Sequence, residues 1–198
     1  MNILVVLGHP KEGSFNHAIA DITVKTLKRS GHKVIFHDLY AEKFDPVLKF
    51  EEIPSDGKVN ANIKKYCEDL ASAEGIVVIH PNWWGQPPAI LKGWVDRVLR
   101  TGVAYDFQEG DSGEGIPIGL LKAEKAVLFN TSNTMGEREL NHFGDPLERL
   151  WKTCIFDLCG VKNVFRKTFS PIVTSTMAQR ETWLQEAAEI VKKEFPRK

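Results

Sequence analysis

The amino-acid sequence predicts a doubly wound α/β sandwich around a five-stranded parallel sheet of strand order 2-1-3-4-5. Short apolar runs typical of buried strands alternate five times with segments that have the period of amphipathic helices. Right-handed crossovers leave few topologies for such an alternation, and five strands favour this order. A length of 198 residues fits one domain, so we expect residues 1–198 to form a single unit.

The elements of the first part of the chain follow from its apolar runs and breakers. Asn2–Leu7 lacks polar alternation, which is typical of a central strand, and the helix expected at 16–29 ends before Gly31, a natural C-terminal cap. Lys33–Asp38 alternates less cleanly, as expected of a strand at or near an edge. The segment 39–60 is rich in turn residues and is long enough to be a functional loop.

The remaining elements repeat the same alternation. They are a helix at 61–73, a strand at 75–79, a helix from Pro87 to Leu99, a strand at 125–131, a helix at 147–158, a strand at 163–169 and a helix at 177–195. Pro87 and Pro88 are tolerated in a first helical turn because those N–H groups would have no partner there. The glycine-rich segment 101–119 is expected to be a mobile loop or a small hairpin.

Composition and charge exclude several classes of protein. The formal charge is +0, so no global field attracts nucleic acid or an anionic membrane. No signal peptide is recognisable at the N-terminus, and no apolar run reaches membrane-spanning length. Cys67, Cys154 and Cys159 have no metal spacing and are expected to be buried thiols. These features predict a cytoplasmic protein without a metal site.

Two adjacent tryptophans follow the strand at 75–79. The loop Pro81-Asn82-Trp83-Trp84-Gly85 is expected at the carboxyl end of a central strand, where open α/β sheets bind ligands. Aromatic side chains in such a loop indicate a flat, conjugated ligand. The alternative is that both tryptophans are core residues that lie near a loop.

The loops after the first and fourth strands carry weaker signals. After the first strand, Ser14 and Asn16 are good N-cap residues, and a helix N-terminus attracts phosphate oxygens. His9 is placed to add a charge-assisted bond to a phosphate. This loop is neither a P-loop nor a dinucleotide fingerprint, and capping alone explains it equally well. The small polar residues at 131–136 suit contacts with ring heteroatoms, or form an ordinary connection.

Taken together, the three loops resemble the NAD(P)H:quinone oxidoreductase family of flavodoxin-like flavoproteins, the DT-diaphorase type. The resemblance rests on His9-Pro10-x-x-x-Ser14-Phe15-Asn16, on Pro81 to Trp84 with Pro88 to Trp94, and on the segment 102–107. It extends over nearly the whole chain, in order from the first strand to the fifth. It implies a flavodoxin-like three-layer sandwich, a bound flavin and two-electron transfer from NADH or NADPH to a quinone.

The resemblance also implies a role for individual residues. The phosphate side of the flavin would contact His9, Ser14, Phe15 and Asn16; its ring would contact Pro81, Asn82, Trp83, Trp84 and Gly85; and its pyrimidine side would contact Thr131, Ser132, Asn133 and Thr134. Tyr105, Phe107 and Trp84 would form the substrate pocket, the first two across the interface of a homodimer. Tyr105 and His142 form the implied catalytic set, with His142 as the hypothesised proton donor to the quinone oxygen.

Two points stay open at this level. The resemblance makes FAD the first choice of flavin and FMN the second, whereas Asn133-Thr134 replaces the Gly-Gly pair of the family and no Tyr follows at a matching place, which weakens FAD over FMN. The alternative functions are a flavodoxin-like electron carrier and a flavin-bound regulatory subunit of a potassium-efflux system. A neutral charge argues against the carrier. Glu137-Arg138-Glu139 is interpreted as a solvated face.

Overall fold

A computed structural model describes residues 1–54, 56–108, 110, 111 and 113–197, so parts of the segments 39–60 and 101–119 lie outside the described residues. Five parallel strands form the sheet: β1 (Asn2–Leu7), β2 (Lys33–Asp38), β3 (Gly75–Pro81), β6 (Lys125–Thr131) and β7 (Asn163–Phe169). Their spatial order is β2-β1-β3-β6-β7, which confirms the predicted order 2-1-3-4-5.

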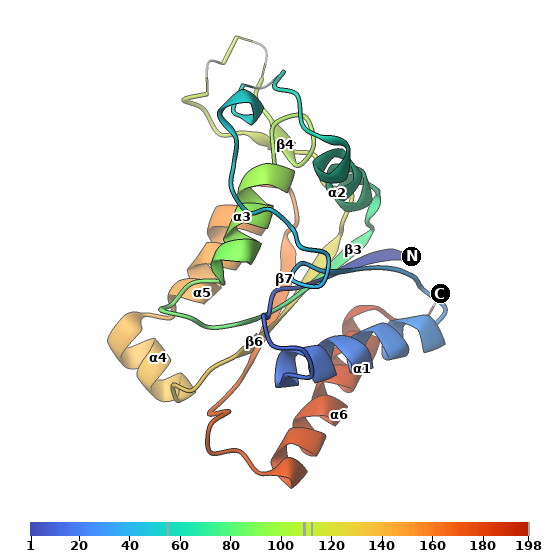
Figure 1. The fold of residues 1–198 in the computed structure, drawn as a ribbon, viewed down its shortest axis with the longest axis vertical. Helices are drawn as coiled ribbons and strands as arrows, with labels where there is room; N and C mark the ends of the chain where they lie inside the picture. The colour runs from blue at the N-terminus through green and yellow to red at the C-terminus, as the bar shows by residue number, and fades with distance from the viewer. Residues whose placement is uncertain (55, 109, 112, 198) are drawn as a thin grey trace.

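Helices cover both faces of this sheet (Figure 1). One face carries α1 (Phe15–Arg29) and α6 (Met177–Glu194), which pack against each other. The other face carries α2 (Ala61–Ser72), α3 (Ala89–Val98) and the helical segment from α5 (Pro146–Arg149) into η2 (Leu150–Asp157). This three-layer arrangement follows from strands that are apolar on both sides and need cover on each.

The strand register shows how burial is distributed across the sheet. One row of paired residues runs Phe36, Val5, Val77, Val127, Phe165. Its three valines are fully buried, whereas Phe36 and Phe165 at the two edges are 40% and 36% exposed. Edge strands lack a neighbour on one side, so the less clean alternation of Lys33–Asp38 is explained by its position.

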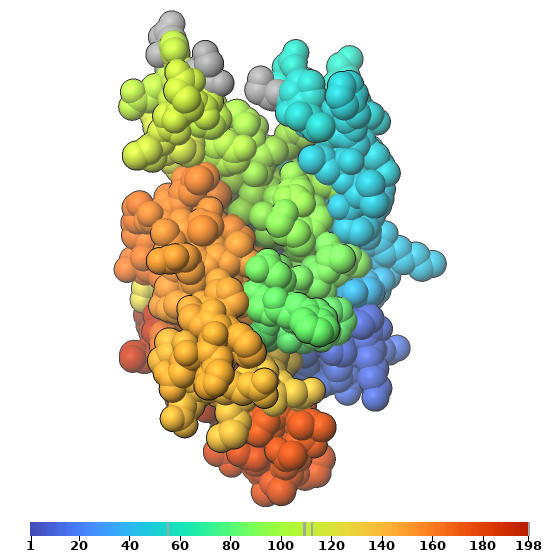
Figure 2. Space-filling model, turned by 90° about the vertical axis from the view of Figure 1, so that its left-hand side faces the viewer, coloured from blue at the N-terminus to red at the C-terminus, as the bar shows by residue number. Residues whose placement is uncertain are grey.

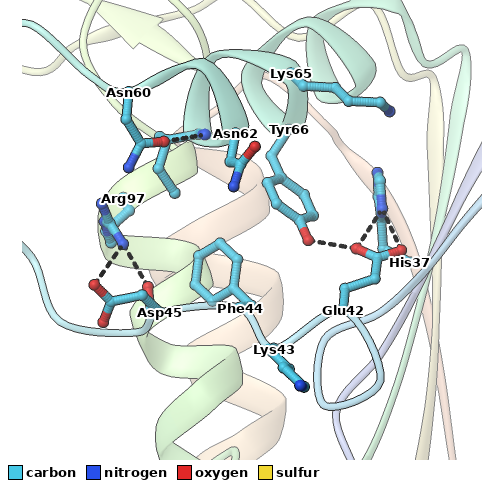
Figure 3. Close-up of a pocket in the computed structure, with 11 residues that line it drawn as sticks. His37, Glu42, Lys43, Phe44, Asp45, Asn60, Asn62, Lys65, Tyr66 and Arg97 are labelled. Atoms are coloured by element: carbon cyan, nitrogen blue, oxygen red, sulfur yellow. Dashed lines mark hydrogen bonds and ion pairs between the residues drawn. The ribbon is translucent and has the colours of Figure 1, made fainter.

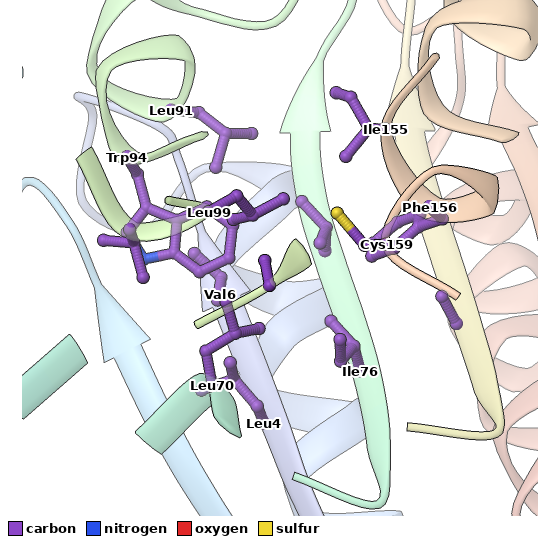
Figure 4. Packing of buried hydrophobic residues seen from close by; sticks show 14 of the residues in the cluster. Leu4, Val6, Leu70, Ile76, Leu91, Trp94, Leu99, Ile155, Phe156 and Cys159 are labelled. Atoms are coloured by element: carbon purple, nitrogen blue, oxygen red, sulfur yellow. The ribbon is translucent and has the colours of Figure 1, made fainter. Parts of the chain in front are cut away.

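Two apolar clusters fill the spaces between the layers. The larger one lies between the sheet and α2, α3 and η2, and Figure 4 shows Trp94 of α3 packed over Leu4, Val6 and Leu70. The smaller one joins α1 and α6 to the opposite side of the same strands, with Phe129 and Phe169 stacked at its centre. Because both clusters rest on the central strands, the carboxyl ends of these strands are held rigidly.

Three elements differ from the sequence-based expectation. Helix α4 (Gly136–Phe143) was not expected, because its eight residues are mostly polar and Leu140 and Phe143 alone are too few to establish a helical period. The helix expected at 147–158 is α-helical only over Pro146–Arg149 and continues as a π-helix. Cys154 is exposed rather than buried, while Cys67 and Cys159 are buried as expected.

The glycine-rich segment contains a small hairpin, as one of the two expected alternatives proposed. Its strands are β4 (Tyr105–Asp106) and β5 (Ile118–Gly119), which pair antiparallel at the end of the molecule away from α4 (Figure 1). In the described part of the chain, no helix combines the length and apolar character that crossing a membrane requires.

The segment 39–60, which includes η1 (Phe50–Glu52), is fixed to the body of the protein by ion pairs. Buried Arg97 of α3 binds the Glu52 carboxylate with Nε and Nη2, at 2.8 and 2.5 Å. His37 lies between the carboxylates of Glu42 and Asp69, and the Tyr66 hydroxyl donates to Glu42 (Figure 3). These contacts line a polar cavity of about 320 Å³ whose charged groups are largely paired with each other.

Candidate active site

The carboxyl ends of β1, β3 and β6 meet at two adjoining clefts. The first, which we name the α1 cleft, has a volume of about 420 Å³ and is lined by His9, Lys11, Gly13, Ser14, Phe15, Asn16, Pro81, Asn82, Trp83, Thr131, Ser132, Asn133, Thr134, Ile172 and Arg180. The second, the Trp84 cleft, has a volume of about 500 Å³ and is lined by Asn82, Trp84, Gly85, Thr134, Glu139, Phe143 and Pro146. Asn82 and Thr134 belong to both, so the clefts adjoin at these two residues.

The α1 cleft is built around a helix N-terminus. Ser14 caps α1, its hydroxyl accepting from the His17 backbone N–H, as the sequence predicts. Asn16 in the first turn is 2% exposed and donates its side-chain amide to the Thr131 hydroxyl at 2.9 Å. Its buried Oδ1 has no partner. An unsatisfied buried oxygen beside a helix N-terminus indicates a place where a ligand supplies a hydrogen-bond donor.

Arg180 of the C-terminal helix α6 places a cation in this cleft. It was not predicted from the sequence. It lies in α6, where Nε donates to the Ser175 hydroxyl at 2.8 Å and Nη2 to the Ile172 carbonyl at 3.0 Å. Its guanidinium also lies 5.9 Å from the centre of the Phe15 ring. These contacts hold the guanidinium, and no carboxylate among the described residues forms an ion pair with it. No local pattern marks such a residue, because only the packing of α6 on α1 brings it there.

His9 closes the outer side of the α1 cleft. Its Nδ1 accepts the backbone N–H of Lys11 at 3.1 Å, and its ring lies 6.3 Å from the Trp83 ring, centre to centre. Burial lowers the pKa of His9 below its ordinary value. Burial thus favours the neutral imidazole, whose Nδ1 also lies 3.3 Å from the Lys11 carbonyl.

The two tryptophans lie in a tight turn on the surface. Trp83 and Gln86 exchange backbone hydrogen bonds at 3.1 and 3.0 Å, and the central residues Trp84 and Gly85 have φ of +57° and +70°. Positive φ at both central positions is the signature of a type I′ turn, which Trp rarely occupies. The Trp84 side chain is 100% exposed and Trp83 is 42% exposed, so the alternative of two core tryptophans is wrong.

Asn82 connects this turn to the neighbouring loops. Its backbone N–H donates to the Thr131 carbonyl at 2.7 Å, and its Oδ1 accepts the Gly85 N–H at 2.9 Å. Its Nδ2 donates to Glu139 Oε1 at 2.8 Å. Any Cβ at position 85 would lie 2.6 Å from Pro146 Cγ, so glycine is required there for space as well as for φ. One side chain thus fixes the wall that both clefts share.

The Trp84 cleft receives its opposite wall from α4, which the sequence analysis did not anticipate. Glu139 is only 9% exposed, so its interpretation as part of a solvated face is wrong. Phe143 follows four residues later on the same side of the helix and also lines the cleft. In Figure 2 the green segment after β3 lies directly beside the orange segment of α4 and α5. The result is an aromatic cleft with one carboxylate.

The structure brings most of the predicted site residues together. All of the predicted cofactor-binding residues line the α1 cleft except Trp84 and Gly85, which line the Trp84 cleft. Tyr105 and Phe107 lie elsewhere, in a pocket with Leu99 and Leu158. His142 is exposed in the last turn of α4, with its ring 6.5 Å from that of Phe143, and is not among the residues that line the cleft. Within the described residues no cluster of three or more potential metal ligands occurs.

A buried polar network supports the clefts from below. His80 of β3 accepts the indole N–H of Trp151 on Nε2 at 2.9 Å, while Nδ1 lies 2.8 Å from the Pro81 carbonyl. The indole can only donate, so Nδ1 carries the imidazole proton and His80 is neutral. Burial lowers its pKa to about 4. Asn130 of β6 contacts the same Nε2 at 3.0 Å and accepts from Arg166 of β7 at 3.2 Å.

With this geometry in place, comparison with known proteins gives the family. Residues 1–194 match the family of proteins with a flavodoxin-like fold. An uncharacterized NAD(P)H oxidoreductase of Haemophilus influenzae is 32% identical over 96% of this chain and 93% of its own. NAD(P)H dehydrogenase [quinone] 1 of Rattus norvegicus is 33% identical over 79% of this chain and 64% of its own.

A solved structure extends the comparison to three dimensions. The NAD(P)H:quinone oxidoreductase of Methanothermobacter marburgensis superimposes with a TM-score of 0.82 at 26% identity, over 98% of this chain and 96% of its own. The chain therefore belongs to the NAD(P)H:quinone oxidoreductase family of flavodoxin-like proteins, and it is an oxidoreductase. The resemblance found in the sequence is confirmed.

The strained turn generates a first prediction, for the protein without ligand. Trp84→Asn places the Asn-Gly pair that type I′ turns prefer, and a fully exposed indole contributes no burial energy to folding. We expect unfolding free energy in urea to rise by about 0.5–1 kcal/mol. Gln86→Asn in the same turn lacks positive φ and should change little. Equal stability of Trp84→Asn and the parent protein would contradict strain at this position.

The buried histidine generates a second prediction. The pKa of His80 is lowered in the fold, so its stabilising effect is complete above pH 6.5 and is lost as pH falls from 6.5 towards 4, because the unfolded chain takes up the proton first. The loss is on the order of 3 kcal/mol over that window. His80→Gln should flatten the fall of unfolding free energy between pH 7 and pH 4.5. The same slope in both proteins would show that His80 is not the responsible group.

Proposed function

We propose that this protein is a flavin-dependent NAD(P)H:quinone oxidoreductase that reduces quinones, or similar aromatic acceptors, by two electrons in a ping-pong reaction. The observation that carries the proposal is that the two clefts adjoin at Asn82 and Thr134. One cleft offers a helix N-terminus and Arg180, which suit phosphate, and the other offers aromatic walls, which suit a flat ring. A molecule with a phosphate at one end and a conjugated ring at the other matches this pair.

The residues present fit a flavin. Phosphate oxygens would be held by the N-terminus of α1 and by Arg180, while a ribityl hydroxyl would supply the donor that buried Asn16 Oδ1 lacks. The ring would lie along the Trp83–Gly85 turn and the 131–134 loop. FAD is the first choice, since Lys11 and Arg180 together offer charge for two phosphates, and FMN is the second choice.

The chemistry divides between the cofactor and the chain. When bound, a flavin supplies two-electron transfer between NADH or NADPH and the acceptor. The chain's own residues orient both substrates in turn: Trp84 and Phe143 offer aromatic surface, and the Asn82-fixed turn sets the position of that surface. In the 131–134 loop, the Asn133 backbone N–H is the candidate to stabilise negative charge on the ring, because the N–H groups of Ser132 and Thr134 already donate to the Phe169 carbonyl and the Ser132 hydroxyl.

The substrate pocket requires a second copy of the chain. Tyr105 and Phe107 do not share a pocket with Trp84 in one protomer, so they contribute to this site only across a homodimer interface. Free Cys67, Cys154 and Cys159 support a reducing cytoplasm as the location. Among the described residues, no feature favours the electron-carrier or the regulatory-subunit alternative. Reaction with NADH or NADPH distinguishes the enzyme from both.

A third prediction tests this function with the purified full-length protein. It should bind flavin, which chromatography after release identifies as FAD or FMN. NADH or NADPH should bleach the absorbance near 450 nm, as is typical of flavins, and a quinone should restore it. A flavin that ignores both nucleotides would indicate a carrier or regulator, and a protein that cannot be loaded with flavin would refute the proposal.

A fourth prediction concerns His142 as proton donor to the quinone oxygen. His142→Ala should slow the oxidative half-reaction with quinone by roughly tenfold or more, within the range of general acid catalysis. The reductive half-reaction with NAD(P)H should be unchanged, and stopped-flow absorbance separates the two. Because the side chain is exposed, the variant should keep the parent's stability. Unchanged rates in both halves would remove His142 from the mechanism.

A further inference from the structure

We propose that Glu139 is a specificity-determining residue that selects the acceptor by charge. Its carboxylate favours neutral and cationic aromatic acceptors over those that carry a sulfonate or carboxylate group. The inference rests on the proposed function, since it takes the Trp84 cleft, where Trp84 and Phe143 orient both substrates beside the flavin ring, as the place where the acceptor ring binds.

The Glu139 side chain is buried within an otherwise exposed part of α4. It is 9% exposed, although its helix neighbours at 137, 138 and 140 are all exposed. Asn82 Nδ2 holds its Oε1 at 2.8 Å. In the described part of the chain no hydrogen bond or ion pair engages Oε2. One oxygen is thus anchored, and the other is left to interact with whatever enters the cleft.

Apart from Glu139, the lining residues of the Trp84 cleft are uncharged. The other residues that line it are Asn82, Trp84, Gly85, Thr134, Phe143 and Pro146, none of which ionises near neutral pH. Glu139 is therefore the single charged group among the described residues of this wall. The carboxylate faces apolar surface rather than a compensating cation.

Two cations near the Trp84 cleft, Arg138 and Arg166, do not line it. Arg138 is exposed and its guanidinium lies 5.7 Å from the centre of the Phe143 ring, without lining the cleft. Arg166 is engaged by Asp145 and Glu148. The cleft consequently keeps a net negative charge next to its aromatic walls. A like charge on a bound ring would be repelled at short range, where solvent screens poorly.

The experiment compares two acceptors across matched variants. Flavin-loaded protein is assayed with 1,4-naphthoquinone and with its 2-sulfonate, so that charge is the main difference between the two rings. Glu139→Gln should raise the ratio of kcat/KM for the sulfonate to kcat/KM for the neutral quinone by roughly tenfold, as expected for one nearby charge. Each quinone is compared with itself, so its reduction potential cancels.

Glu137→Gln is the matched control, because it removes the same charge from an exposed position on the same helix. It should leave both acceptors unchanged within about twofold, because exposed charges are screened. If Glu137→Gln and Glu139→Gln shift the sulfonate equally, the effect is one of net charge and the proposal is overturned. It is also overturned if Glu139→Gln leaves the ratio of the two acceptors at the parent value.

A second readout avoids turnover altogether. Binding of the same two quinones to the oxidised protein, without nicotinamide, is followed by quenching of tryptophan fluorescence. Glu139→Gln should lower Kd for the sulfonate by a similar factor and leave Kd for the neutral quinone unchanged. If the parent protein binds quinones but does not reduce them, the proposed function fails while this ratio still decides the role of Glu139. An unchanged binding ratio refutes that role.

Discussion

The site depends on three hydrogen bonds made by one residue, Asn82. Its backbone joins the end of β3 to the end of β6, its Oδ1 fixes the turn at Gly85, and its Nδ2 holds Glu139 of α4. Segments that are far apart in the sequence are thus fixed relative to each other by one amide side chain. Asparagine suits this position because it offers a donor and an acceptor at once, which Asp and Leu do not.

The sheet beneath makes that arrangement rigid. Its central strands are buried on both faces, so their carboxyl ends cannot shift without disturbing two apolar clusters. Polar groups at this depth must be paired, and the neutral imidazole of His80 meets that demand by accepting from Trp151 and by contacting Asn130. Arg166 extends the same network to Asp145, directly after α4. The wall of the Trp84 cleft is therefore supported by the polar layer below it.

The sequence alone was sufficient for the sheet, its order and the loops that form the α1 cleft, because apolar runs and their connections are local signals. It was insufficient wherever a residue acts through tertiary packing. Arg180 reaches the cleft from α6, and Glu139 lies on a helix of eight residues with only two large apolar side chains, so neither position carries a local mark. Tyr105 and Phe107 were predicted from the resemblance, yet one protomer does not bring them to Trp84, and their contribution across a homodimer interface stays a prediction.

The two clefts carry opposite charge, and this polarity has a consequence for how one site serves two substrates. Arg180 and the N-terminus of α1 make the α1 cleft positive, whereas Glu139 makes the Trp84 cleft negative. A ligand with phosphates and a neutral ring has one favourable orientation in this field. Under the proposed function, substrates that bind in turn at the aromatic end would experience the carboxylate without a compensating cation. Trp84, strained and fully exposed, supplies ring surface at that end, and its conformational cost is consistent with selection for binding rather than for stability.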